Sequence, residues 1–142
     1  MAARKHRKLR MLKQEAETQQ TKADFEKLCA QSPIIFPSSG KKLIQVPDKH
    51  GVYVISDRVG RVLHVGRTYR GKAGLKQRIK NHLNGQSSFV HTYIKGNKRQ
   101  LRRGYTFKFL EVGHARRRAL LEHYATGMLS PAHLGLGKSL KP

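Results

Sequence analysis

The stretch Gly51–Asn84 restricts the fold most, because it reads as a β-hairpin followed by a helix. Two short runs are rich in apolar and β-branched residues with period-two spacing, which predicts two strands: Val52 and Val54, then Val62, Leu63 and Val65. Between the runs lie residues typical of turns, Asp57, Arg58 and Gly60. Consecutive strands this close in sequence are expected to pair antiparallel.

Each predicted strand carries a tripeptide of similar form, Gly51-Val52-Tyr53 in the first and His64-Val65-Gly66 in the second. The glycines suit positions where a backbone or a ligand comes close. A basic loop over residues 67–74 leads into LKQRIKNHL, in which apolar residues recur at helical spacing: Leu75, Ile79 and Leu83. Arg78 and His82 are four residues apart and therefore share one face of this helix.

Together, GVY, HVG and R-x-x-x-H on a helix resemble the GIY-YIG nuclease domain over roughly residues 50–134. The resemblance implies a small three-stranded antiparallel sheet flanked by helices, in the α+β class. It also implies a phosphodiester-cleaving site with one divalent metal ion, Mg²⁺ being the expected one. We therefore expect a nuclease-like domain over residues 48–135.

The composition restricts the partner more than the fold. The 142 residues carry a net charge of +22 with a pI near 10.9, which favours a polyanionic partner, DNA before RNA. No apolar run is long enough to span a membrane. The single cysteine, Cys29, excludes an internal disulfide and favours an intracellular location, in cytoplasm or nucleoid, with organelle targeting left open. The oligomeric state is not indicated.

The N-terminal segment 1–31 is predicted to be a basic helical extension. Residues 4–13 contain six Lys or Arg residues, and the following residues favour helix. Three interpretations remain open: a solvated, partly disordered extension, a DNA-clamping basic helix, or a targeting segment. Residues 32–47, with three prolines, are predicted to be an irregular linker whose Ile34-Ile35-Phe36 packs onto the core.

The second half of the domain is predicted to contain a strand and a long helix. Residues 105–112 alternate and are rich in aromatic residues, which indicates a third strand. Residues 115–129 indicate a helix that ends before Pro131 and whose core face holds Leu121, Ala125, Met128 and Leu129. Residues 136–142 form a basic tail. Between the helices, residues 86–104 are predicted to be a short helix or structured loop with a dense basic cluster that favours phosphate contacts: Lys95, Lys98, Arg99, Arg102 and Arg103.

Carboxylates are scarce in the predicted domain, since only Asp57, Glu111 and Glu122 follow residue 50. A two-metal phosphodiesterase or a paired-carboxylate glycosidase is disfavoured on this ground. The resemblance implies that Glu122, nine residues before Pro131, is the metal ligand. The alternative is that Glu122 is only an i, i+4 partner of Arg118 on the same helix.

The resemblance also assigns the basic residues of the site. Arg78 matches the helix arginine that contacts the scissile phosphate, a role that suits a guanidinium. His82 would hydrogen-bond the phosphate or the leaving group, and Arg67 would contact phosphate. The alternative for each is an ordinary surface residue. His91, His114 and His123 are interpreted as surface or helix-cap histidines.

Tyr53 and His64 are the candidates for activating water. A phenol is a poor base unless its pKa is lowered, so Tyr53 either positions water or is a core tyrosine. His64 departs from the family, in which a tyrosine usually opens the second tripeptide. An imidazole accepts a proton more readily, yet the change can also mark an altered site. A second departure is Leu134, which stands where the family tends to carry asparagine.

Two functions follow as hypotheses. The first is a metal-dependent endonuclease of the GIY-YIG type that cleaves DNA. The second is a non-catalytic RNA- or DNA-binding protein, for example a ribonucleoprotein component, with a degenerate domain of this fold. The convergence of Tyr53, His64, Arg78 and Glu122 on one basic surface is the geometric feature that would favour the first.

Overall fold

The computed structural model describes residues 2–38, 46–69, 71 and 73–134 of the chain. Its element order is α1 (Ala2–Cys29), β1 (Ile34–Ile35), β2 (Gly51–Ser56), β3 (Val62–Arg67), α2 (Leu75–Leu83), η1 (Phe89–Tyr93), η2 (Lys98–Arg102), β4 (Thr106–Glu111) and α3 (Ala115–Leu129). The class is α+β, as predicted. The described helices include none that is both long and apolar enough to cross a membrane.

The sheet is antiparallel, with strand order β1-β4-β2-β3. The expectation of three strands was wrong, because Ile34 and Ile35 in the predicted linker pair with Phe107 and Thr106 and add a fourth strand. A two-residue strand has too short a pattern to be distinguished from a linker. Phe36, directly after it, is buried as expected.

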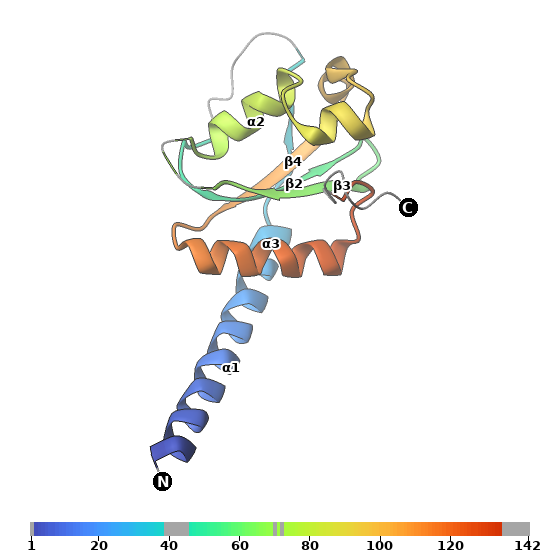
Figure 1. Ribbon diagram of the computed structural model, residues 1–142. Coiled ribbons are helices and arrows are strands. Elements are labelled where there is room, and N and C mark those ends of the chain that lie inside the picture. Colours follow the sequence, from blue (N-terminus) through green and yellow to red (C-terminus); the bar gives the residue numbers. More distant parts are fainter. Residues whose placement is uncertain (1, 39–45, 70, 72, 135–142) are drawn as a thin grey trace.

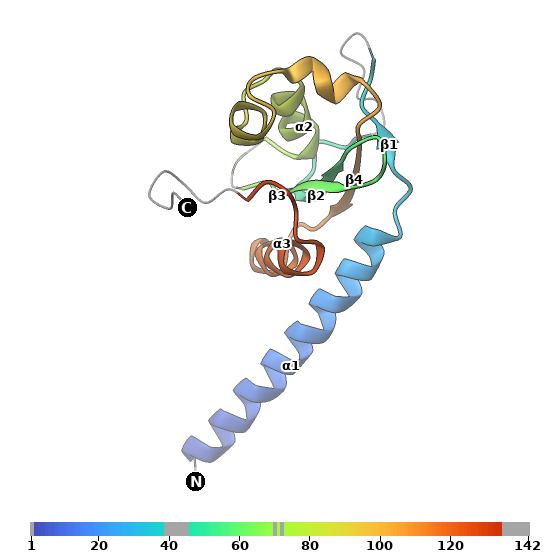
Figure 2. The same ribbon diagram turned by 90° about the vertical axis from the view of Figure 1, so that its right-hand side faces the viewer.

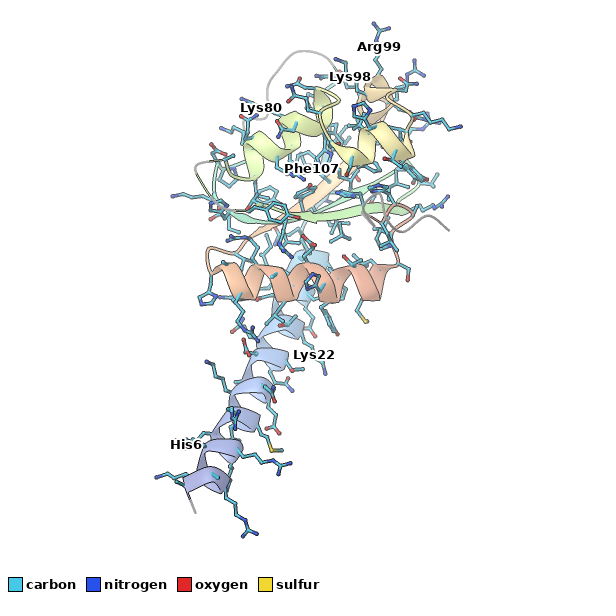
Figure 3. All side chains as sticks on the ribbon, viewed as in Figure 1. His6, Lys22, Lys80, Lys98, Arg99 and Phe107 are labelled. Atoms are coloured by element: carbon cyan, nitrogen blue, oxygen red, sulfur yellow. The ribbon has the colours of Figure 1, made fainter. Side chains whose placement is uncertain are left out.

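The sheet separates two apolar layers. In Figure 1, α2, η1 and η2 lie on one face, and α3 lies on the other. Alternation along β2 supplies both layers, since Tyr53 and Ile55 belong to the α2 side and Val52 and Val54 to the α3 side. Figure 3 shows Phe107 between the sheet and the α2 layer.

The β2–β3 hairpin forms as the sequence predicts. The carboxylate of Asp57 accepts hydrogen bonds from the backbone amides of Val59 and Arg61, and Gly60 has a φ of +89°. The strand pairing shifts between Ile55 and Ser56, so that Leu63 stands between the paired positions. The three apolar residues of α2 are all buried, in agreement with their helical spacing.

The predicted core face of α3 is mostly confirmed. Leu121 and Ala125 are buried and Leu129 is partly buried. The placement of Met128 was wrong, because its side chain is 58% exposed. His114 caps the helix as its side chain accepts a hydrogen bond from the amide of Arg117, and Ser130 ends it in a left-handed conformation.

The N-terminal extension is a single 28-residue helix, as predicted, and it projects away from the sheet (Figure 2). Its buried residues all lie in the C-terminal part: Thr21, Asp24 and Leu28. Residues 86–104 form the two short helical turns η1 and η2, in agreement with the expectation of a short helix or structured loop. The predicted tail over residues 136–142 lies outside the described residues.

Candidate active site

The predicted site residues gather around β3, which is an edge strand. Tyr53 on β2 pairs with Gly66 on β3, so the tyrosine ring lies over the glycine. A Cβ atom at Gly66 would stand 2.4 Å from the Tyr53 hydroxyl oxygen. Glycine is therefore required here for close approach, which is the role that the sequence indicated for it.

Tyr53 takes part in a buried hydrogen-bond chain. Its hydroxyl lies 2.7 Å from Nε2 of His82, and Nδ1 of His82 lies 2.7 Å from Oγ of Ser87. Ser87 also accepts a hydrogen bond from the amide of Val90. Both ring nitrogens of His82 are therefore engaged inside the protein, and the side chain is 1% exposed. This arrangement makes His82 a support for Tyr53, in contrast to the phosphate contact expected for it.

The protonation of this chain follows from its burial. Burial raises the pKa of Tyr53 to about 12, against the opposing effect of the Arg78 charge. Burial, together with the charges of His64 and Arg78, lowers the pKa of His82 well below its ordinary value. At neutral pH Tyr53 is thus a protonated phenol and His82 a neutral imidazole. Tyr53 can donate or accept a hydrogen bond but is not itself a strong base.

His64 is paired with a second histidine at the end of the described chain. Nδ1 of His64 lies 3.1 Å from Nδ1 of His133, and the His64 ring stacks on Phe89. The amide of His133 donates to the carbonyl of Leu63, which holds this segment against β3. Burial, then the charges of His133 and Arg78, lower the pKa of His64 to about 3, so its ring is neutral at pH 7.

The hydrogen bonding of His64 leaves one ring nitrogen for other partners. Two neutral imidazoles that meet through Nδ1 atoms require one of them to carry its proton on Nδ1. If His64 is the donor, its Nε2 is an acceptor. Among the hydrogen bonds of the described residues, none engages this Nε2. His64 can therefore accept a proton from a water molecule, although its low pKa makes it a weak base on its own.

Arg67, Arg78 and Glu122 form a charged cluster on the other side of Tyr53. Nη1 of Arg67 lies 3.5 Å from Oε1 of Glu122, and the charges of both arginines act on this carboxylate. Burial raises the pKa of Glu122, and the two arginines and His123 oppose that rise. Both guanidinium groups also lie over the ring of Tyr69, at 5.0 and 5.9 Å.

Two nitrogen atoms of this cluster lack a hydrogen bond. Among the described side chains, Nη1 of Arg67 and Nε of Arg78 are the buried nitrogen atoms that make no hydrogen bond, although Nη1 of Arg67 takes part in the ion pair with Glu122. Leaving such a donor unsatisfied costs about 1–3 kcal/mol, or more for a charged group. The cluster therefore has unused hydrogen-bonding capacity for an anion beside a single carboxylate.

Arg118 holds the loop that carries Arg67 and Tyr69. It is buried and donates to the carbonyl oxygens of Thr68 at 3.0 Å, Val112 at 2.9 Å and Gly113 at 3.1 Å, with a longer contact of 3.4 Å to that of Tyr69. It does not pair with Glu122, the alternative that sequence spacing left open, because Arg67 takes that position.

No sequence pattern assigned a role to Ser87 or His133, and Arg118 was considered only as a helix partner for Glu122. The family resemblance drew attention to Leu134, which is 48% exposed, whereas it is the adjacent His133 that enters the site. A histidine adjacent to an expected polar position was the one signal present. Ser87 and Arg118 act through contacts that no local pattern reveals.

The basic cluster of residues 95–103 is not brought to this site. Figure 3 shows Lys98 and Arg99 on the outer side of the α2 layer, away from α3, which carries Glu122. Arg102 is partly structural, since its Nη1 donates to the carbonyl of Pro37. A separate hollow of about 430 Å³ is lined by Lys98, Arg99, Arg102 and Arg103 together with Ser38, Leu83 and Asn84. His91, His114 and His123 are exposed, as expected.

The fit of a metal ion rests on Glu122 alone. Within the described residues, no group of three or more His, Cys, Asp or Glu side chains is placed to hold a metal ion. Mg²⁺ is often bound through one or two carboxylates, with water and substrate phosphate completing its shell. The neighbouring charges of Arg67 and Arg78 disfavour a bare cation, so Glu122 fits Mg²⁺ when a phosphate is bound as well.

Neither a comparison with models of known protein families nor one with curated proteins finds a match to this chain.

Proposed function

We propose that this protein is a metal-dependent endonuclease of the GIY-YIG type that hydrolyses phosphodiester bonds in DNA. The observation that carries the proposal is the cluster of Arg67, Arg78 and Glu122 beside Tyr53, in which two buried guanidinium nitrogens make no hydrogen bond. These residues come from β2, β3, α2 and α3, yet they meet around one edge strand.

A phosphodiester would supply both hydrogen-bond acceptors and negative charge to the two arginines, whereas water supplies only acceptors. Its anionic oxygens accept hydrogen bonds from Arg67 and Arg78, and its charge offsets theirs. The same donors stabilise the additional charge that develops on phosphorus oxygens in the transition state. Tyr53, held by His82, offers its hydroxyl to the same group or to the attacking water.

His64 is the proposed proton acceptor for that water. Its ring is neutral at pH 7, and its Nε2 is available when Nδ1 bonds to His133. A bound phosphate would counter the charge of Arg78, which is one cause of the low pKa of His64. The water oxygen would then bond to phosphorus as the phosphorus–oxygen bond to the leaving strand breaks. The leaving oxygen takes up a proton from solvent or Tyr53.

Glu122 is the residue that would hold Mg²⁺ together with the substrate phosphate. The ion would supply Lewis-acid stabilisation of the phosphate charge. An intracellular, reducing location agrees with one free, exposed cysteine, Cys29.

A second function has a specific observation in its favour. Tyr53 and His82 are almost completely buried, and the pKa of His64 is low for a base. A non-catalytic RNA- or DNA-binding protein, such as a ribonucleoprotein component, could use the same anion site without cleaving its ligand. It would bind nucleic acid in a salt-sensitive manner, and it would not cleave the nucleic acid in the presence of any divalent metal ion.

Plasmid cleavage with Mg²⁺ separates the two functions. We expect Glu122→Gln and Arg78→Ala to lower the cleavage rate by roughly 100-fold or more, as removal of a transition-state contact does elsewhere. Arg61→Gln removes a charge from the exposed β2–β3 turn and should leave the rate within about twofold of wild type. Equal rates in all four proteins would indicate a contaminating nuclease, and binding without cleavage would favour the second function.

A further inference from the structure

The N-terminal half of α1 is a solvent-exposed helix. Residues 2–16 are exposed at every position. Figures 1 and 2 show this part projecting from the body in both views. At about 1.5 Å per residue the free part is roughly 22 Å long. We name residues 2–16 the arm.

The base of the arm is fixed to α3 and the sheet by polar contacts. The carboxylate of Asp24 is fully buried and accepts two hydrogen bonds from the guanidinium of Arg117, at 2.7 and 2.6 Å. Glu17 pairs with Arg116, and Nζ of Lys108 donates to the carbonyl of Cys29 at 2.8 Å. A buried carboxylate is costly unless paired, so this contact specifies one orientation of α1.

The charge of the arm surrounds the helix. Successive residues of a helix turn by about 100°, so Arg4 and Lys13, nine residues apart, point to opposite sides. The six basic residues leave no neutral face: Arg4, Lys5, Arg7, Lys8, Arg10 and Lys13. Figure 3 shows side chains radiating from this part of α1, where His6 is labelled. Phosphates that flank a helix on both sides match such a distribution.

The apolar residues of the arm are too few and too divided for a continuous docking stripe. Leu9 and Leu12, three residues apart, share one side of the helix, whereas Met11 lies nearly opposite Leu9, and all three are more than half exposed. A membrane-surface helix needs its apolar residues on one face. The major groove of duplex DNA admits an α-helix and places phosphates along both of its sides.

We propose that the arm lies in the major groove of duplex DNA and forms a second binding surface, directed by the Asp24–Arg117 pair. The inference shares with the proposed function only the assumption that DNA is the partner. The arm extends the contact beyond the site around β3. It accounts for the exposed, oriented basic helix, which catalysis at Glu122 does not require.

Binding in EDTA tests this surface without any cleavage. Fluorescence anisotropy would measure the affinity of the full chain for a 30-base-pair DNA duplex over a range of salt concentrations. In the arm variant, the six basic residues are changed to Gln. Each lost phosphate contact lowers the salt-dependence slope by about 0.9, so we expect a decrease of at least about 3. An unchanged slope would overturn the proposal.

An RNA duplex of the same sequence separates groove binding from general charge attraction. The major groove of A-form RNA is too deep and narrow for a helix, so the arm variant should change the RNA slope by less than about 1. An equal loss on DNA and RNA would overturn groove binding. Binding of the wild type to anionic vesicles that is lost in the arm variant, with DNA binding unchanged, would assign the arm to a membrane instead.

The orientation is tested by a variant that keeps the net charge. Asp24→Asn with Arg117→Gln removes one charge of each sign and should weaken binding to the 30-base-pair duplex at least fivefold. Circular dichroism and thermal melting check its fold, and Glu17→Gln with Arg116→Gln is the alternative if it does not fold. If either of these double variants folds and binds the duplex with wild-type affinity, the proposal that the contacts between α1 and α3 direct the arm is overturned. Because the binding assay needs no cleavage, the arm proposal can fail while the nuclease proposal holds, and the nuclease proposal can fail while the arm proposal holds.

Discussion

Gly66 sets how closely the two sides of the candidate site approach. The Tyr53 hydroxyl occupies the space in which any other residue would place its Cβ atom. This close contact aligns Tyr53 with His82 and keeps the ring against the edge strand. The glycine of the second tripeptide thus has a packing cause independent of any family resemblance.

Substitution of Gly66 by Ala is therefore expected to displace Tyr53. We expect a loss of about 1–3 kcal/mol in the free energy of unfolding, the usual cost of overpacking. Urea denaturation measures it. Gly127→Ala is the matched control, because a Cβ there meets no atom within 4 Å and lies in α3, where alanine favours helix. Equal midpoints for both variants would contradict the packing role of Gly66.

The buried histidines should make stability depend on pH. The folded-state pKa of His64 is about 3, below its ordinary value of 6.5, and that of His82 is also lowered. Between these values the unfolded chain binds protons that the folded protein does not, so stability falls as the pH falls below about 6.5. Each such histidine contributes about 1.4 kcal/mol per pH unit.

Urea denaturation between pH 5 and 6.5 measures this effect above the titration range of most carboxylates. Replacement of His64 by Gln should reduce the dependence by about one proton. An unchanged pH dependence in a folded His64→Gln variant would mean that the imidazole already takes up its proton in the native protein.

Individual residues were predictable to different degrees. Motif order placed Tyr53, Arg78 and Glu122, and the structure brings them together. The partners that define their chemistry were not predictable, since His64 and His133 are 69 positions apart in sequence. Burial decides the pKa of Tyr53 and His64, and burial is a property of the folded chain.

At the level of elements, periodicity predicted α2, α3 and the strands β2, β3 and β4, because their apolar residues repeat at the period of a helix or a strand, whereas helix-favouring residues predicted α1. The short strand β1 was missed, since two residues have no period and its pairing with β4 is long-range. Met128 was wrongly predicted to lie in the core, since helical spacing does not show that its side chain, one residue before the end of α3, is exposed. The α1 helix itself was expected, whereas its fixed direction depends on the Asp24–Arg117 pair.

The two parts of α1 should contribute differently to stability. Deletion of residues 2–16 is expected to change the free energy of unfolding by less than about 0.5 kcal/mol, because each of these residues is exposed and none is buried against the body. Leu28→Ala, at a fully buried position, should cost about 2–5 kcal/mol. Thermal and urea denaturation compare the two. A large loss on deletion would show that the arm folds back onto the body in solution.

At the level of the whole molecule, the candidate site encloses an edge strand from both faces of the sheet. Arg78 and Tyr53 approach from the α2 side, and Arg67 and Glu122 from the α3 side. The basic arm and the cluster of residues 95–103 lie elsewhere on the surface (Figure 3). The basic residues behind the net charge of +22 are thus spread over several surfaces, whereas Glu122 lies at the candidate site.

A double-mutant cycle on single-turnover cleavage of a DNA duplex with Mg²⁺ tests the central claim most directly. If Arg78 and Glu122 act on the same phosphate, Arg78→Ala and Glu122→Gln should each lower the rate by roughly 100-fold or more. The double variant should then be little slower than the slower single variant, because groups that act as a unit are not additive. A shared catalytic site would be contradicted if the rate loss in the double variant equals the product of the two single losses. A wild-type rate in either folded single variant would contradict it as well.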